Sequence, residues 1–364
     1  MLLVLISVPA IGLLFFQNRQ VQTSISNYLT HKFSDEIEAG VSISSVKYSF
    51  FKRLYLYDFL IEDQYGDTLI YSEFTRIRIK NFKPGKLDIH FHSISCENVY
   101  FNIKVDNERL NNVKFFTDWL KSDLPPEERV VLKIDRIETI NSHFSQTAAL
   151  VKSPPYGVDF SDMDVYNVNV VIEDFVARMD SVYMNIVQTS GIEKSGFNMV
   201  DVAFGLTVGQ QFMTFSDGEI ITPASKASIP IVDFRFNDYM DFQEVFDSVD
   251  TYISSSNSFL AFSDLSYFFY QLEHMNGDIY LNGIVHGKFG DLFGEDIEIS
   301  YMDSSKLDFD MNLRGMPSDD SLHMVFDIKQ FRSDLHTLKT LTSYYDYAIF
   351  KDSIITEDIG TFNY

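Results

Sequence analysis

The sequence TRIRIK at residues 75–80 alternates charged and aliphatic side chains without a break. Successive side chains of a β-strand point to opposite faces, so Arg76, Arg78 and Lys80 are expected on one face. Ile77 and Ile79 are then expected on the other face. The segment therefore predicts a strand with one wet face and one apolar face.

The same period of two recurs on both sides of this stretch and through most of the chain. KLDIHFHSI (86–94) sets Leu87, Ile89 and Phe91 against Asp88, His90 and His92. NVYFNIKV (98–105) sets Val99, Phe101, Ile103 and Val105 against Tyr100, Asn102 and Lys104. The alternation returns in 167–174, with Val168, Val170 and Ile172, and in 277–289, 296–303, 306–315 and 321–331. We therefore expect a mainly β protein.

Short turn sequences separate many of these runs. They lie at 64–67, 83–86, 276–278 and 316–320 and contain Gly, Pro, Asn or Asp. Such turns join antiparallel neighbours, whereas parallel strands need long crossover connections. The sequence therefore favours antiparallel meanders over a βαβ architecture.

Helical periodicity is confined to short pieces that we expect to cover or plug the sheet. They lie at 113–121, 239–253, 263–272 and 331–341. Ser263 and Asp264 are expected to cap the third of these. Pro125-Pro126 and Pro154-Pro155 mark soft boundaries, which give a first β unit at 41–122 and further β units over 130–364.

Composition limits the classes of function. The chain has 364 residues, and 29 Lys and Arg against 52 Asp and Glu give a net charge of −23. Nucleic acid is a poor partner for such a surface, because phosphate backbones would be repelled. Cys96 is the single cysteine, so an intrachain disulfide is excluded, and no Cys/His spacing offers a zinc site. Phenylalanine and tyrosine are abundant, at 34 and 20 residues.

The first 16 residues, MLLVLISVPAIGLLFF, carry no charge. As a helix they would span roughly 24 Å, short of a hydrocarbon core of about 30 Å. Neither a basic start nor a small-x-small cleavage site is present, so we expect an uncleaved anchor that continues as an amphipathic helix to about residue 30. A cleaved signal followed by a soluble helix is the alternative.

The stretch from Val41 to Ile79 resembles the start of the Bacteroidota branch of the TamB family, in the AsmA-like superfamily. It reads VSISSVKYSFFKRLYLYDFLIEDQYGDTLIYSEFTRIRI. SISCENVYFNIKV (93–105), IEKSGFNM (192–199), DLSYFFYQL (264–272) and RGMPSDDS (314–321) resemble later family landmarks in the same order. EDQYGDTL together with EKSGF is the most specific part of a resemblance that covers nearly the whole chain.

The resemblance implies an inner-membrane protein with a single-pass N-terminal anchor and a periplasmic body. That body would be an elongated, taco-like antiparallel β-groove, an open sandwich whose apolar lining conducts phospholipid acyl chains towards the outer membrane. It also implies a partnership with an outer-membrane β-barrel in protein assembly. Family members are far longer, and this chain ends in GTFNY (360–364), so we expect it to be an N-terminal portion that lacks the family's C-terminal domain.

The alternating apolar residues are the candidate lining of such a groove. They are Ile77, Ile79, Leu87, Ile89, Phe91, Val99, Phe101, Ile103, Val168, Val170 and Ile172. Sequence alternation is the same in a closed sandwich, where these side chains would be ordinary core. A lipid conduit and a scaffold whose open strand edges template outer-membrane proteins therefore both stay open.

Catalytic and cofactor motifs are missing from the sequence. It contains no nucleophile elbow, P-loop, HExxH or dinucleotide fingerprint, so we expect neither an enzyme nor a cofactor. His90 and His92 form a possible metal pair without a third ligand. The Asp-x-Asp pairs at 162–164 and 308–310 lack the Gly and Glu of a calcium loop and are expected to face solvent. Cys96 is interpreted as a small core residue.

Overall fold

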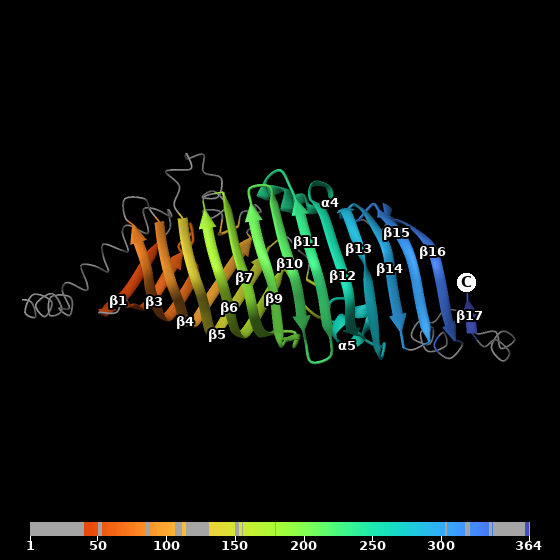
Figure 1. The fold of residues 1–364 in the computed structure, drawn as a ribbon, viewed down its shortest axis with the longest axis horizontal. Coiled ribbons are helices and arrows are strands. Elements are labelled where there is room, and N and C mark those ends of the chain that lie inside the picture. Colours follow the sequence, from red (N-terminus) through yellow and green to blue (C-terminus); the bar gives the residue numbers. More distant parts are fainter. Residues whose placement is uncertain are drawn as a thin grey trace, which may run out of the picture. The chain divides into compact units, whose positions relative to one another are not determined.

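The computed structural model describes residues 40–49, 53–83, 88–105, 111–113, 131–149, 153–154, 156–178, 180–302, 304–316, 321–334, 337 and 361–363. The chain divides into two compact units. Unit 1 takes in the chain up to Ser153 together with Asp159–Gly196, and unit 2 takes in Pro154–Val158 together with Phe197–Tyr364. Both units consist mainly of β-strands (Figure 1), which confirms the expectation of a mainly β protein.

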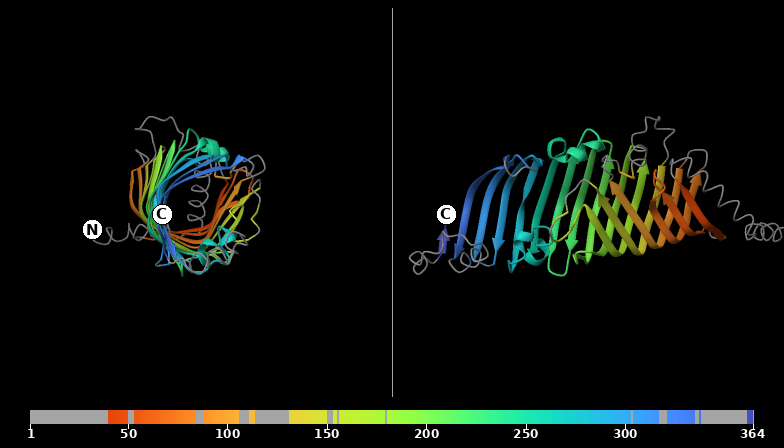
Figure 2. Two further views of the ribbon diagram at one scale, coloured as in Figure 1. Left: turned by 90° about the vertical axis from the view of Figure 1, so that its right-hand side faces the viewer. Right: turned by 180° about the vertical axis from the view of Figure 1, so that it is seen from behind.

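Unit 1 is a sheet whose strands follow one another in chain order. They are β1 (Val41–Ser49), β2 (Arg53–Glu62), β3 (Thr68–Lys83), β4 (Asp88–Val105), β5 (Val131–Ala148), β6 (Asp162–Arg178) and β7 (Ser181–Glu193). Each strand pairs antiparallel with the next, apart from β4 and β5, which run parallel. The long strands are bent, so their two halves cross in projection (Figure 2).

Unit 2 continues the same kind of meander. Its strands are β8 (Asn198–Met199), β9 (Asp201–Gly209), β10 (Phe212–Ile221), β11 (Lys226–Arg235), β12 (Asp250–Ala261), β13 (Asp278–Lys288), β14 (Asp291–Tyr301), β15 (Ser305–Arg314), β16 (His323–Asp334) and β17 (Thr361–Asn363). From β9 to β17 every neighbouring pair is antiparallel.

Helices in the described part of the chain are short and belong to unit 2. They are η2 (Tyr239–Glu244), α4 (Val245–Ser248), α5 (Phe262–Leu265) and η3 (Tyr270–Leu272). The ring of Phe242 lies against Phe234 and Phe236, with centroids 6.0 and 5.1 Å apart, and Val249 after α4 is fully buried. Aromatic packing therefore fixes this short helical segment to its own sheet.

Three helix predictions need correction. The helix expected to reach residue 253 ends at Ser248, because β12 begins at Asp250. The helix expected from residue 331 is contradicted at its start, since Phe331 to Asp334 extend β16. Asp264 does not cap α5: the N-cap is Ala261, and the Asp264 carboxylate instead accepts hydrogen bonds from Thr222 and Ser225.

Two further expectations concern helices near the N-terminus and at 113–121, and the boundary at Pro125-Pro126. The expected anchor and amphipathic helix, residues 1–30, falls outside the described residues, as does almost all of the helix expected at 113–121. Within the described ranges no helix is long and apolar enough to cross a membrane. β5 pairs with β4, so the sheet continues across the boundary expected at Pro125-Pro126.

Candidate functional site

A row of aliphatic residues crosses unit 1 from strand to strand. Residues directly opposite each other on neighbouring strands lie on the same face of a sheet. The register places six such residues in line: Leu54, Ile77, Ile94, Ile137, Ile172 and Ile186. All six side chains are only partly buried. We call this line the aliphatic row.

A second apolar row crosses the same strands nearer their other ends. It contains Ile61, Ile70, Phe101, Phe144 and Val165. The rings of Phe101 and Phe144 are in contact, with centroids 5.8 Å apart. Of this second row only Val165 is buried, and the others are partly exposed.

Kinks between the two rows bring them to the same face of the sheet. Asp58, Asn98, Asn141 and Asn167 have φ between 49° and 53°, a left-handed conformation that Asn and Asp tolerate better than other side chains. On β3, Thr75 Oγ1 donates a hydrogen bond to Ser72 Oγ at 2.9 Å, so residues three apart share one side. A regular strand would put them on opposite sides, so the alternation shifts by one at this level.

The kink residues Asp58, Asn98 and Asn141 make hydrogen bonds across the strands. Asn141 Nδ2 donates to Asn98 Oδ1 at 2.7 Å, and the Asn141 backbone N–H donates to Asn169 Oδ1 at 3.1 Å. Tyr71 donates to Asp58 at 2.9 Å. The kink residues themselves are exposed, so these polar contacts lie away from the apolar rows.

The expected lining residues fall on this pattern as follows. Ile77 and Ile172 belong to the aliphatic row and Phe101 to the second row. Ile79 is opposite Phe91, and Phe91 is opposite the buried Ile134. Val99 is opposite Ser72, Ile103 opposite Gln146, Val168 opposite Ser142, Val170 opposite Thr139, and the backbone of Ile89 is opposite Leu132. Leu87 lies outside the described residues, and whether these side chains line a groove stays a prediction.

Several residues of the two rows were not predicted. Ile137 and Phe144 belong to β5, a strand that the alternation did not reveal, and Leu54, Ile94 and Ile186 complete the aliphatic row. On β5 the register shifts between Thr139 and Phe144, so a fixed period of two fails there. The signal that could have found the strand is an Asn or Asp between two alternating apolar runs.

Asn102 corrects one expectation about the wet face. Its side chain is buried rather than exposed, because Asn112 folds back over it. Asn112 Nδ2 donates to the Asn102 carbonyl at 2.9 Å and to Asp63 Oδ2 at 3.3 Å. Asp63 in turn accepts the backbone N–H groups of Tyr65 and Asp67, so this cluster fixes the β2–β3 turn.

The face opposite the rows is polar and rich in ion pairs. Asp135 accepts from Lys80 at 2.8 Å, His90 at 2.5 Å and His92 at 3.0 Å. Partial burial acts to raise the pKa of Asp135, but these three hydrogen bonds outweigh it and hold the pKa well below its usual range. The two histidines therefore both hydrogen-bond to the carboxylate of Asp135.

Other candidate ligands on the described residues are also engaged. No group of three His, Cys, Asp or Glu there could hold a metal ion. Asp162 pairs with Lys194, Asp164 with His143, and Asp310 with Lys329. Burial raises the pKa of the Cys96 thiol, although hydrogen bonds from Thr75 and Ser72 act against it, so this thiol is a poor nucleophile.

Comparison with known proteins adds no family. No family model matches the chain, and no curated protein matches it. The class defined by the geometry is therefore a mainly β protein with antiparallel meanders, and the resemblance to the TamB family remains an expectation.

Proposed function

We propose that the apolar face of unit 1 holds phospholipid acyl chains, in an inner-membrane-anchored periplasmic protein that moves phospholipid towards the outer membrane. The observation that carries the proposal is the aliphatic row. It runs without a polar interruption over six strands, yet each of its side chains is partly exposed. An apolar surface of this kind is stabilised when hydrocarbon covers it.

Acyl chains suit such a surface because they need no specific ligand residue. Each methylene group taken out of water contributes about 0.8 kcal/mol. A row of aliphatic side chains can therefore hold lipids of different lengths and let them slide. The proposal accordingly assigns no catalytic residue and no cofactor.

Site-specific photo-crosslinking in the full chain tests the proposal. A photoreactive residue at Ile137 should capture phospholipid in cells, because Ile137 lies in the middle of the row. The matched control is Glu138, the next residue, which is opposite Ser95 on the polar face. Equal capture of lipid at both positions, or capture of another segment of the chain at Ile137, would contradict the proposal.

A second candidate function is a scaffold that templates strands of outer-membrane proteins. It is favoured by β16, where consecutive side chains are exposed on both faces: Met324, Val325, Phe326 and Ile328 are 45–54% exposed. Among the described residues, only β15 pairs with His323–Phe331 of β16, because β17 pairs with Arg332 to Asp334. An open apolar edge is a template for another strand.

The lipid conduit and the scaffold predict different contacts: lipid at the aliphatic row, or a protein strand at β16. A photoreactive residue at Phe326 should capture a protein strand if β16 is a template. The control is Phe293 on β14, a partly exposed aromatic residue on a strand paired at both edges. Lipid at Ile137 with no protein at Phe326 favours the conduit, and the reverse pattern favours the scaffold.

A further inference from the structure

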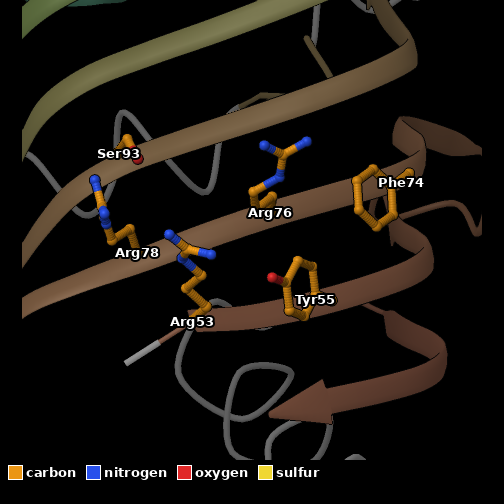
Figure 3. A pocket seen from close by; sticks show the side chains of 6 residues that line it. All are labelled: Arg53, Tyr55, Phe74, Arg76, Arg78 and Ser93. Atoms are coloured by element: carbon orange, nitrogen blue, oxygen red, sulfur yellow. The ribbon is translucent and has the colours of Figure 1, made fainter. Parts of the chain in front are cut away.

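A hollow on the polar face of unit 1 gathers three arginines. It has a volume of about 410 Å³, within the range of small-molecule sites, which is roughly 300–1,000 Å³. β2, β3 and β4 each contribute to its wall (Figure 3). The lining residues are Arg53, Tyr55, Phe74, Arg76, Arg78 and Ser93.

The arrangement of these arginines is costly without a bound anion. Arg53 is directly opposite Arg78 in the β2–β3 register, and Arg76 is two residues from Arg78 on the same strand. Like charges directly opposite each other destabilise a sheet. Figure 3 shows the three guanidinium groups gathered at the same hollow. A negatively charged ligand would turn this repulsion into attraction.

None of the three arginines has an ion-pair partner among the residues that the structure describes. On the neighbouring strand β5, by contrast, Arg136 contacts Glu138 at 2.7 Å and Glu173 at 2.6 Å. The donors of Arg53, Arg76 and Arg78 are therefore available to a ligand.

Two aromatic rings orient one of these donors. Tyr55 and Phe74 stack with centroids 6.1 Å apart, and the Arg76 guanidinium carbon lies 5.9 Å from the Phe74 centroid. Stacking on a ring holds a guanidinium plane in a fixed orientation. The planar fork of arginine matches the oxygens of a phosphate group, and Ser93 adds a hydroxyl donor.

We propose that this hollow binds the phosphate group of a phosphate ester. The inference goes beyond the proposed function, because the hollow lies on the face opposite the aliphatic row. The ester can be a soluble metabolite or a lipid headgroup, since the same oxygens are presented by both. Phosphate is the chemical class that three guanidinium groups and a hydroxyl lining one hollow recognise.

The test uses the full chain and two probes. Glycerol 3-phosphate and a short-chain phosphatidylglycerol, kept below its micelle concentration, are titrated separately by calorimetry at constant ionic strength. The test variant is Arg76→Gln with Arg78→Gln. The control is Arg178→Gln, an exposed arginine at the end of β6 that also has no ion-pair partner in the described residues.

The double variant should weaken binding of at least one probe by roughly tenfold or more, because two of the three guanidinium donors are lost. Arg178→Gln should leave both unchanged, and Arg78→Lys should give an intermediate loss because charge remains without the fork. A loss with glycerol 3-phosphate identifies a soluble ester, and a loss only with the short-chain lipid identifies a headgroup. Equal behaviour of the double variant and the control in both arms overturns the proposal. Unchanged circular dichroism and thermal midpoint exclude misfolding.

Discussion

Replacing Ile137 with Ala tests whether the aliphatic row is an open face or a closed core. Complete burial of an isoleucine side chain contributes about 1.5–3 kcal/mol. Ile137 is only partly buried, so less than this, roughly 1–2 kcal/mol, should be lost in Ile137→Ala. The comparison is Leu69→Ala on β3, where the side chain is 1% exposed and the loss should be about 2–5 kcal/mol.

The measurement is urea unfolding of the purified full chain with lipid removed. The variants are compared by midpoint, after a check that the denaturant slope is unchanged. Ile137→Asp should stay folded by circular dichroism, whereas Leu69→Asp should not, because the second charge has no access to water. If Ile137→Ala costs as much as Leu69→Ala, or Ile137→Asp unfolds the chain, the row is a closed core and the reasoning fails.

Three further predictions concern the polar side of the fold. Asp135→Asn should lower stability at neutral pH. The difference in stability between this variant and the original protein should shrink as the pH falls below the ordinary range of carboxyl pKa values. The reason is that a carboxyl group whose pKa is lowered by folding stabilises the fold only while it is charged. Urea midpoints from pH 7 to about 3 measure this. Asn141→Val should destabilise more than Asn141→Gly, because a β-branched side chain is strained at φ 52° and glycine is not; equal urea midpoints would contradict a left-handed kink. Asp264→Ala should cost about 1–3 kcal/mol in thermal unfolding, because the hydroxyls of Thr222 and Ser225 lose their acceptor. Ser263→Ala should change the stability little; a large loss would instead indicate that residues 263–264 form a helix cap.

The sequence predicts strands wherever charge and apolarity alternate without interruption. Residues 75–80 are such a case: Arg76, Arg78 and Lys80 are exposed on β3, while Ile77 and Ile79 are partly buried. The residues of a strand do not reveal which other strand it pairs with, however. β4 pairs in parallel with β5, and no residue on either strand signals this pairing.

Local pattern also fails where a distant residue supplies the environment. The alternation predicts that the side chain of Asn102 is exposed to solvent. It is buried instead, because Asn112 packs against it and donates hydrogen bonds to the Asn102 carbonyl and to Asp63. Asp264 has the sequence position of a helix cap, and its carboxylate instead serves the β10–β11 turn through Thr222 and Ser225. In both cases the deciding hydrogen bond joins residues that are ten or more positions apart.

The kinks explain how strands of 16 to 18 residues keep their apolar side chains on one face while they bend. A shift of the alternation by one residue moves every later side chain to the other face, so a kink in one strand alone would break an apolar row. Asn98 and Asn141 are joined by a side-chain hydrogen bond, and Phe59, Ser72 and Val99 remain in register just beyond the kink. The shift therefore occurs at the same level in neighbouring strands, and both apolar rows stay continuous. A left-handed residue costs most side chains roughly 1–2 kcal/mol, which is why Asn and Asp occupy these positions. Searching for alternation separately on each side of such an Asn or Asp would have identified β5 from the sequence, whereas the two rows depend also on how the strands pair.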